Sequence, residues 1–195
     1  VIAAVRSTYD MNGAAMKKKG GPSYVFLRIG NAICNLFLTV IRGTPVVVQL
    51  MIMYFIILVN VTNGVLVAVI AFGINSGAYV AEIFRSGIMS IDEGQFEAGR
   101  SLGFNYIQTM IHIIIPQACS TVFPPLSNSL IGLVKDTSLA YSVALVEILA
   151  SAQRIAARTY DYLWLYLEAA FVYLMICSIL TVLQHRGEKA LEARR

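Results

Sequence analysis

The sequence predicts an all-α protein whose helices cross a lipid bilayer several times. Hydrophobic residues make up 57% of its 195 residues and charged residues only 13%, whereas soluble domains typically carry about 25% charged residues. Residues 46–59 (VVVQLMIMYFIILV) have Gln49 as their one strongly polar side chain, so a helix there has no water-facing stripe. Lipid is therefore the expected environment for most of the chain.

Four stretches are apolar enough for membrane spans, which need about 20 residues. They lie at residues 44–60, 64–87, 107–133 and 162–183. Thr44 and Pro45 suit the start of the first span. Residues 25–41 precede it and are expected to form either an interfacial helix or a lengthened, kinked base of the same span. Pro116 lies inside the third span, where it should kink the helix or open its hydrogen-bond ladder.

The chain begins with residues 1–5 (VIAAV), a short apolar stub. We expect it to be the end of a further apolar segment whose start lies outside the sequence. Cytoplasmic loops carry an excess of Lys and Arg. If the stub leaves the membrane on the cytoplasmic side, only Lys135, Arg154 and Arg158 face outward. The other twelve basic residues, and the C-terminus, then face the cytoplasm: Arg6, Lys17, Lys18, Lys19, Arg28, Arg42, Arg85, Arg100, Arg186, Lys189, Arg194 and Arg195.

Several function classes are not supported by the residues. The net charge of +4 comes from basic residues at the ends of apolar runs, not from a basic stripe with aromatics, so a nucleic acid is not an expected partner. The three cysteines form no CxxC motif, and His112 and His185 are isolated, so no metal site is expected. No nucleophile and base stand at a recognisable spacing either, and no catalytic residue is predicted.

A charged, glycine-punctuated segment at residues 90–103 separates the second and third spans. Ser90 and Glu93 have the spacing of a capping box, which predicts a helix over residues 91–102. Gly103 suits the end of that helix, and Asn105 can start the next one. The segment is therefore predicted to be a compact helical elbow in the cytoplasm, although any cytoplasmic loop can contain a capped helix.

Residues 134–161 are too charged for a simple span and are assigned to the external side. Apolar residues recur at helical spacing over residues 140–157, with Glu147 and Arg154 seven positions apart. This pattern predicts a short helix at the outer mouth of the bundle. An interfacial cover with no further role is an equal alternative.

Polar side chains within a membrane are costly and mark candidate substrate sites. Asp136 is the first candidate, because its carboxylate can pair with an amino group of a substrate; a structural ion pair with Lys135, Arg154 or Arg158 is the alternative. Glu82 is expected to form a helix-end pair with Arg85. The full set of candidates is Gln49, Asn75, Glu82, Asp136, Thr137, Glu147 and Glu168.

The elbow carries a recognisable motif. Glu97-Ala98-Gly99, Gly103, Ile113 and Ile115-Pro116 are similar to the EAA loop of ABC importer permeases, E-A-A-x3-G-x9-I-x-L-P, and match its spacing at every position. Two residue types depart from the pattern. Gly99 replaces an alanine, which a helix favours by about 1 kcal/mol, and Ile115 replaces a leucine.

Three further segments resemble motifs of the polar amino-acid branch of these permeases, so that the resemblance covers residues 42–158. They are Arg42-Gly43-Thr44-Pro45 followed by VVVQL, residues 78–85 (AYVAEIFR) and residues 133–139 (LVKDTSL). The resemblance implies a type I importer fold with about five spans, an external N-terminus and a cytoplasmic C-terminus. It also implies that residues 90–103 form a coupling helix within one permease domain over residues 1–195. The implied contact or hinge residues are Glu97, Ala98, Gly99, Arg100 and Gly103.

The function implied is import of a polar amino acid, or a close analogue, across the bacterial plasma membrane by alternating access. ATP and Mg²⁺ would be bound by a separate ATPase subunit dimer, with no cofactor on this chain. The other implied partners are a second permease subunit, identical or different, and an extracytoplasmic amino-acid-binding protein. The favoured substrate-site residues are Asp136, Thr137, Gln49 and Glu147. Two alternatives are an ion-gradient-driven transporter, using Asp136, Glu147 and Glu168, and a structural or assembly protein without transport.

Overall fold

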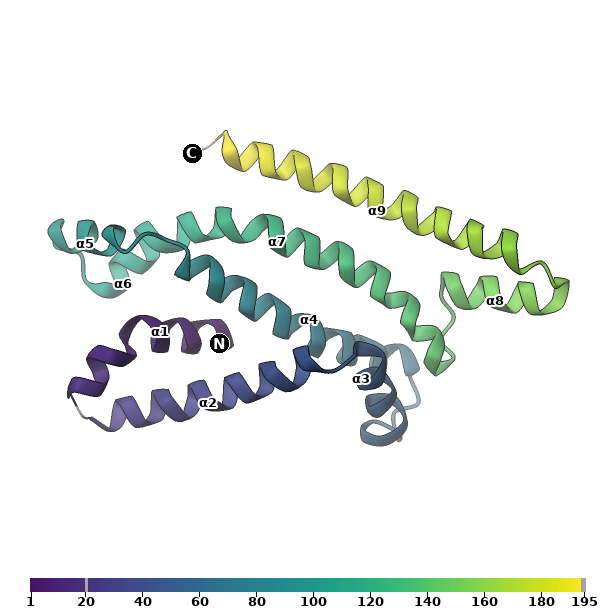
Figure 1. The fold of residues 1–195 in the computed structure, drawn as a ribbon, viewed down its shortest axis with the longest axis horizontal. Helices are drawn as coiled ribbons and strands as arrows, with labels where there is room; N and C mark the ends of the chain where they lie inside the picture. The colour runs from purple at the N-terminus through teal and green to yellow at the C-terminus, as the bar shows by residue number, and fades with distance from the viewer. Residues whose placement is uncertain (20, 194–195) are drawn as a thin grey trace. The chain divides into compact units, whose positions relative to one another are not determined.

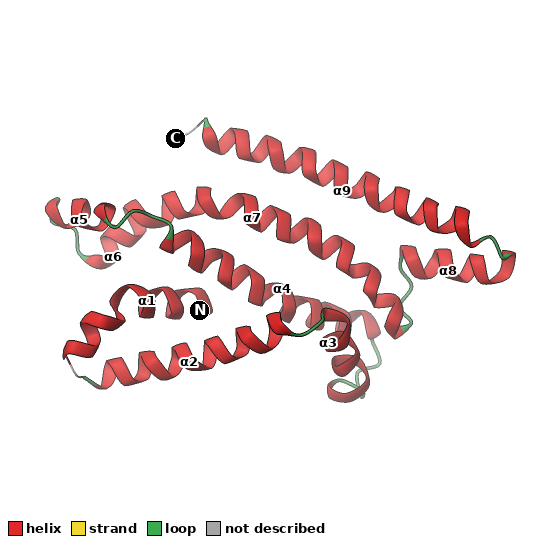
Figure 2. Cartoon of the chain, in the orientation of Figure 1, coloured by secondary structure: helices red, strands yellow, loops and turns green. Residues whose placement is uncertain are grey.

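A computed structural model describes residues 1–19 and 21–193, and over these residues it contains helices and short connections but no strand (Figures 1 and 2). The predicted all-α class is therefore confirmed. Gly20, Arg194 and Arg195, two of them among the predicted cytoplasmic basic residues, lie outside the described residues. The helices are α1 (Ile2–Lys19), α2 (Pro22–Gly43), α3 (Val46–Ile52), η1 (Met53–Ile57), α4 (Gly64–Met89), α5 (Gly94–Ser101), α6 (Tyr106–Thr109), η2 (Met110–Ile114), α7 (Ile115–Asp136), η3 (Thr137–Val143), α8 (Ile148–Thr159) and α9 (Tyr162–Glu192).

Three of these helices are long and apolar enough to cross a membrane: α2, α4 and α9. A fourth span results if residues Tyr106–Val143 and Ile148–Thr159, which are bent by 47° relative to each other, are counted together. The predicted spans at 64–87 and 162–183 correspond to α4 and α9. Most apolar side chains of α2 and α9 are exposed, as expected for helices that face lipid or other subunits in a membrane.

The predicted first span, residues 44–60, is wrong in its position. The helix there covers only α3 and η1, Val46–Ile57, which is shorter than a span, whereas the preceding α2 has 22 residues. Pro45 takes the cap position of α3 in an extended conformation, and no side chain caps the helix. The hydroxyl of Thr44, the expected cap, instead accepts a hydrogen bond of 2.6 Å from the side-chain amide of Gln49. Residues 2–5 of the predicted stub form the first turn of helix α1, which continues to Lys19.

Pro116 lies in the first turn of α7, directly after the π-helical segment η2. The N–H of Ile115 bonds to the carbonyl of Met110, five residues earlier. Because a proline has no N–H to continue an α-helical ladder, a wider turn in front of it accommodates the interruption. The prediction that Pro116 would open the ladder is therefore confirmed.

The described chain forms two compact units. The first comprises residues Val1–Gly43 and Ala78–Leu126. In it, α1 and α2 run alongside each other (Figure 1), and the elbow of α5 and α6 follows the end of α4.

The second unit comprises Thr44–Gly77 and Ser127–Arg195. Its core joins α3, the first half of α4, and η3 through six buried residues: Leu50, Ala68, Ala71, Phe72, Ala140 and Val143. Helix α8 packs against α9 and buries the small side chains of Ala150, Ala152 and Ala156. Small residues at such an interface let two helices approach closely.

The predicted helix over residues 140–157 is wrong at its start. Residues Thr137–Val143 form the 3-10 helix η3, and Ala144 then adopts a left-handed conformation with φ 59°. The following helix, α8, begins only at Ile148. The apolar spacing continues across this break, which is why periodicity alone did not reveal it.

Candidate functional site

The elbow between α4 and α7 begins with an aspartate turn. The Asp92 carboxylate accepts a 2.6 Å hydrogen bond from the N–H of Gly94, the first residue of α5. Ser90, the predicted cap, instead donates its hydroxyl proton to the carbonyl of Gly87 in α4. The predicted capping box of Ser90 and Glu93 is therefore wrong, and α5 is shorter than predicted.

Gly103 ends α5 as predicted. Its φ of +82° lies in the region that L side chains rarely adopt. The N–H of Gly103 bonds to the carbonyl of Arg100 at 2.9 Å, and the N–H of Phe104 bonds to the carbonyl of Gly99 at 3.0 Å. This pair of bonds is a Schellman motif, which satisfies carbonyls that the end of a helix leaves open.

Asn105 begins α6, also as predicted. Its side chain accepts a hydrogen bond from the backbone N–H of Gln108, and the Gln108 side chain accepts one from the backbone N–H of Asn105, both at 2.9 Å. The Schellman motif thus ends α5 and the capping box begins α6, with two residues between the C-cap Leu102 and the N-cap Asn105. Together they fix the direction in which the chain turns from α5 into α6.

Gly99 is buried and touches the next helix. A Cβ atom placed on it would lie 2.7 Å from Thr109 Oγ1, 2.8 Å from Thr109 Cγ2 and 3.3 Å from Ile113 Cδ1. Glycine at this position therefore allows α5 to pack against the helix that follows. Glycine therefore stands in place of the second alanine of the EAA pattern because the buried side chain of Thr109 leaves no room for a Cβ.

The opposite face of α5 is open. Glu97, Ala98 and Arg100 are exposed, and a cavity of about 250 Å³ beside them is lined by residues of α1, α4, α5 and α6. The Phe96 and Tyr106 rings also line this cavity and stack with their centroids 6.3 Å apart. The five predicted coupling residues thus divide into an exposed set of three and two glycines that shape the elbow.

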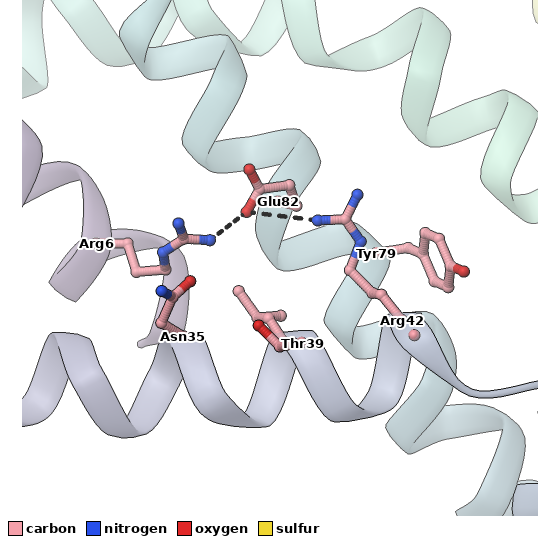
Figure 3. Close-up of a pocket in the computed structure, with 8 residues that line it drawn as sticks. Arg6, Asn35, Thr39, Arg42, Tyr79 and Glu82 are labelled. Carbon is pink, nitrogen blue, oxygen red and sulfur yellow. Dashed lines mark hydrogen bonds and ion pairs between the residues drawn. The ribbon is translucent and has the colours of Figure 1, made fainter.

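A second polar site lies in the first unit and is centred on Glu82 (Figure 3). Its Oε2 lies 2.6 Å from Arg6 Nη1, and its Oε1 lies 2.6 Å from Arg85 Nη2. Arg85 also reaches Asp10 at 2.8 Å. The predicted pair of Glu82 and Arg85 is therefore present, but α1 contributes two further charged partners, Arg6 and Asp10.

Gln49 and Asn75 lie together in the second unit. The side-chain amide of Asn75, which is 8% exposed, donates to Gln49 Oε1 at 3.0 Å, and Gln49 donates to the backbone carbonyl of Thr44 at 3.1 Å. This chain of hydrogen bonds satisfies polar groups inside an apolar unit. It joins α4 to the start of α3.

Glu147 acts as the cap of α8. Its carboxylate accepts from the N–H groups of Leu149 at 2.7 Å and Ala150 at 2.6 Å, and from the hydroxyl of Tyr173 in α9 at 2.9 Å. Three donors therefore already hold this carboxylate, and they tie α8 to α9.

Asp136 is half-buried at the end of α7 and forms no ion pair with any charged residue that the structure describes. The expected alternative partners Lys135, Arg154 and Arg158 are thus not engaged with it. Thr137 donates its hydroxyl proton to the carbonyl of Val134, and Glu168 is exposed on α9. The structure does not bring the four favoured substrate-site residues into one cluster.

Sequence analysis did not place Arg6, Asn35, Thr39, Arg42 and Tyr79 in a site, yet they line one cavity with Glu82. A signal was available for two of them, since Arg42 and Tyr79 belong to the segments 42–45 and 78–85 that were singled out as motifs. Among the described residues, no three His, Cys, Asp or Glu side chains are grouped to hold a metal ion.

Comparison with known proteins decides the family. Residues 21–192 match the family described as binding-protein-dependent transport system inner membrane component. The chain belongs to this family. It is thus a permease subunit of an ATP-binding-cassette importer and a multi-pass membrane protein.

Individual relatives agree. The permease is 44% identical over 163 residues to the L-cystine transport system permease protein of Bacillus subtilis (strain 168), covering 82% of this chain and 70% of the relative. It is 37% identical over 169 residues to the glutamine transport system permease protein of Escherichia coli (strain K12), covering 84% and 77%.

Solved structures place the fold of the permease. A crystal structure of an amino acid ABC transporter with histidines matches with a TM-score of 0.79 and 30% identity, over 97% of this chain and 86% of that one. An inward-facing methionine ABC transporter matches with a TM-score of 0.73 and 16% identity, over 97% and 84%. The predicted type I importer permease fold is therefore confirmed.

Proposed function

We propose that this permease moves a polar amino acid, or a close analogue, into the cytoplasm by alternating access. The names of its relatives support this substrate class, since they include permeases for L-cystine and glutamine. Alternating access requires that two states of the membrane helices expose a polar path first on one side and then on the other. The substrate-site candidates Asp136, Thr137, Gln49 and Glu147 belong to this proposal, with Asp136 the least engaged of the charged ones.

The elbow couples the membrane helices to a separate ATPase subunit. The observation that supports this role is the form of α5: a short helix with an exposed charged and small face, preceded by the Asp92 turn, ended by the Schellman motif and packed through Gly99 onto Thr109. A helix fixed in this way can transmit a displacement to α4 and α7 instead of absorbing it. Glu97, Ala98 and Arg100 contact the ATPase subunit, while Gly99 and Gly103 set the geometry of the lever.

The remaining partners follow from the same role. ATP hydrolysis, with its Mg²⁺, takes place on a dimer of the ATPase subunit, and this chain binds no cofactor. A second permease, identical or different, completes the membrane part, and an extracytoplasmic binding protein delivers the amino acid. The protein resides in the bacterial plasma membrane with its C-terminus in the cytoplasm, the side on which most of its basic residues were assigned.

The test is reconstitution of the permease in lipid vesicles with candidate ATPase subunits and binding proteins. Accumulation of radiolabelled amino acids is measured across a panel, with ATP, without ATP and without the ATPase subunit. Accumulation of one or a few polar amino acids only in the complete, ATP-supplied system is the expected result. Accumulation without the ATPase subunit, driven by a proton or sodium gradient, would contradict the proposal and favour a secondary transporter.

A further inference from the structure

A charged cavity in the first unit stands apart from the elbow. It has a volume of about 380 Å³, and α1, α2 and α4 line it with Arg6, Asn35, Thr39, Arg42, Tyr79 and Glu82, besides Leu38 and Gly43 (Figure 3). Small-molecule sites in proteins typically have about 300–1,000 Å³. The cavity therefore has room for a molecule of the size of an amino acid.

Charge in this cavity exceeds what internal pairing requires. Among the residues that line it, two guanidinium groups, those of Arg6 and Arg42, face one carboxylate, that of Glu82. Arg6 makes the close ion pair with Glu82, so Arg42 is the more weakly held of the two cations. Its Nη1 lies 3.9 Å from Glu82 Oε2, beyond hydrogen-bond distance, and its side chain is 40% exposed, against 19% for Glu82. Its guanidinium instead lies over the Tyr79 ring, 5.4 Å from the centroid.

The cavity is also short of hydrogen-bond acceptors. The Nε–H of Arg6 is buried and has no acceptor among the residues described. The guanidinium group of Arg42 donates no hydrogen bond to another described residue. A buried donor without a partner costs about 1–3 kcal/mol, so a ligand with a carboxylate would supply what the cavity lacks. Glu82, in turn, accepts one hydrogen bond from Arg6 and two from Arg85, which leaves about one of the four lone-pair sites of its carboxylate for a further donor.

Arg42 and Glu82 thus present opposite charges to one cavity, as a long ion pair of 3.9 Å without a hydrogen bond between them. An α-amino acid carries the complementary pair, a carboxylate and an ammonium group on one carbon. We propose that this cavity binds the head group of a zwitterionic amino acid, with the ligand carboxylate on Arg42 and the ligand ammonium on Glu82. Asn35 and Thr39 supply further polar contacts, and the ligand side chain remains outside this set of contacts.

This assignment rests on the proposed function, since it names where the transported class of molecule is held in the membrane subunit. It also explains why segments 42–45 and 78–85, far apart in sequence, each place residues on the same cavity. Charges in a membrane protein that are not needed for internal pairing are costly, and persist where they serve transport. An anionic lipid headgroup is the competing occupant, and it would need only the guanidinium groups.

The experiment uses the permease with its ATPase subunit in vesicles of neutral phosphatidylcholine, without a binding protein. The labelled probe is the amino acid that the complete wild-type system accumulates best. Two unlabelled competitors keep its side chain: the amine that lacks the carboxylate, and the acid that lacks the amino group. Binding is compared for the wild type, Arg42→Gln and Arg28→Gln, a matched control because Arg28 is exposed on the same helix and does not line the cavity.

We expect Arg42→Gln to weaken binding of the amino acid by about tenfold or more, as for the loss of a hydrogen bond to a charged group. The wild type should prefer the amino acid over the amine, and Arg42→Gln should lose that preference while still rejecting the acid that lacks the amino group. Arg28→Gln should match the wild type. If Arg42→Gln fails to assemble, Arg42→Lys, which keeps the charge but loses the planar donor pair, should give a smaller loss with the same change in preference.

Unchanged discrimination in both Arg42 variants would overturn the assignment, as would failure of the wild type to bind the probe. A loss that is seen only in vesicles with anionic phospholipid would overturn it in favour of a lipid headgroup. These results differ from failure of the proposed function itself, in which the complete wild-type system accumulates no amino acid from the panel.

Discussion

Substitution of Gly99 tests how the elbow is held together. In an open helix, Gly→Ala stabilises by about 1 kcal/mol. Here the new Cβ would meet Thr109 Oγ1 at 2.7 Å and Cγ2 at 2.8 Å, and crowding of this kind costs about 1–3 kcal/mol. We therefore expect Gly99→Ala to destabilise the packing of α5 by up to about 2 kcal/mol, the overpacking cost less the gain in helix propensity.

The same reasoning predicts a reversal when Thr109 is shortened. In a Thr109→Ala background the two contacts below 3.0 Å are removed and only the flexible end of Ile113, at 3.3 Å, must shift, so Gly99→Ala should stabilise α5 by up to about 1 kcal/mol. The coupling energy between the two positions should then be about 1–3 kcal/mol, in the range found for residues in contact. Ala98→Gly is the matched control, because Ala98 is exposed on the same helix and should cost about 1 kcal/mol in either background.

Hydrogen–deuterium exchange of the α5 amides in the purified, detergent-solubilised chain measures these differences as local opening free energies. Each 1.4 kcal/mol corresponds to about a tenfold change in protection. Equal stabilisation by Gly99→Ala with and without Thr109 would refute the close packing of α5 on α6. A similar coupling for Ala98→Gly would show that the effect does not come from this contact.

Three further predictions concern single residues. Gly103→Ala should raise exchange of the last turn of α5, because its φ of +82° costs an L residue about 1–2 kcal/mol. Glu147→Ala should lower the stability of α8 by about 0.5–2 kcal/mol through loss of its cap, whereas Tyr173→Phe should have a smaller effect, both seen as exchange of the α8 amides; equal effects would show that the cap is not the main contribution. Asp136→Asn should change uptake or its preference among amino acids, and unchanged uptake would remove Asp136 from the proposed path.

Local features of the elbow were predictable from sequence because their signals are local. Gly103 has no Cβ and therefore suits the left-handed end of a helix, whereas the side chain of Asn105 suits the cap of the next helix. The structure places each residue in that role. Ser90 and Asp92 show the limit of such reasoning. Both can cap a helix, and only the position of Gly87 in α4, which takes the Ser90 hydroxyl, decides between them.

Longer-range features were not predictable from spacing. Hydropathy identified α4 and α9, since their apolar runs have the length of a span, but it did not divide residues 22–57 correctly between α2 and α3. Arg6, which pairs with Glu82, and Asp10, which pairs with Arg85, both come from α1, 76 and 75 residues away in sequence. No periodicity within one helix reports a contact of that kind, so the charged cavity became visible only when three helices were placed together.

Charge reversal at Glu97 tests the central claim, that α5 couples transport to an ATPase subunit. In vesicles that contain the permease, its ATPase subunit and the binding protein, ATP-driven uptake is measured for the wild type, Glu97→Lys and Asp161→Lys, a control at an exposed position before α9. Because a like-charge contact at an interface costs several kcal/mol, Glu97→Lys should lower uptake by about tenfold or more and Asp161→Lys should not. Wild-type uptake by Glu97→Lys would contradict the claim.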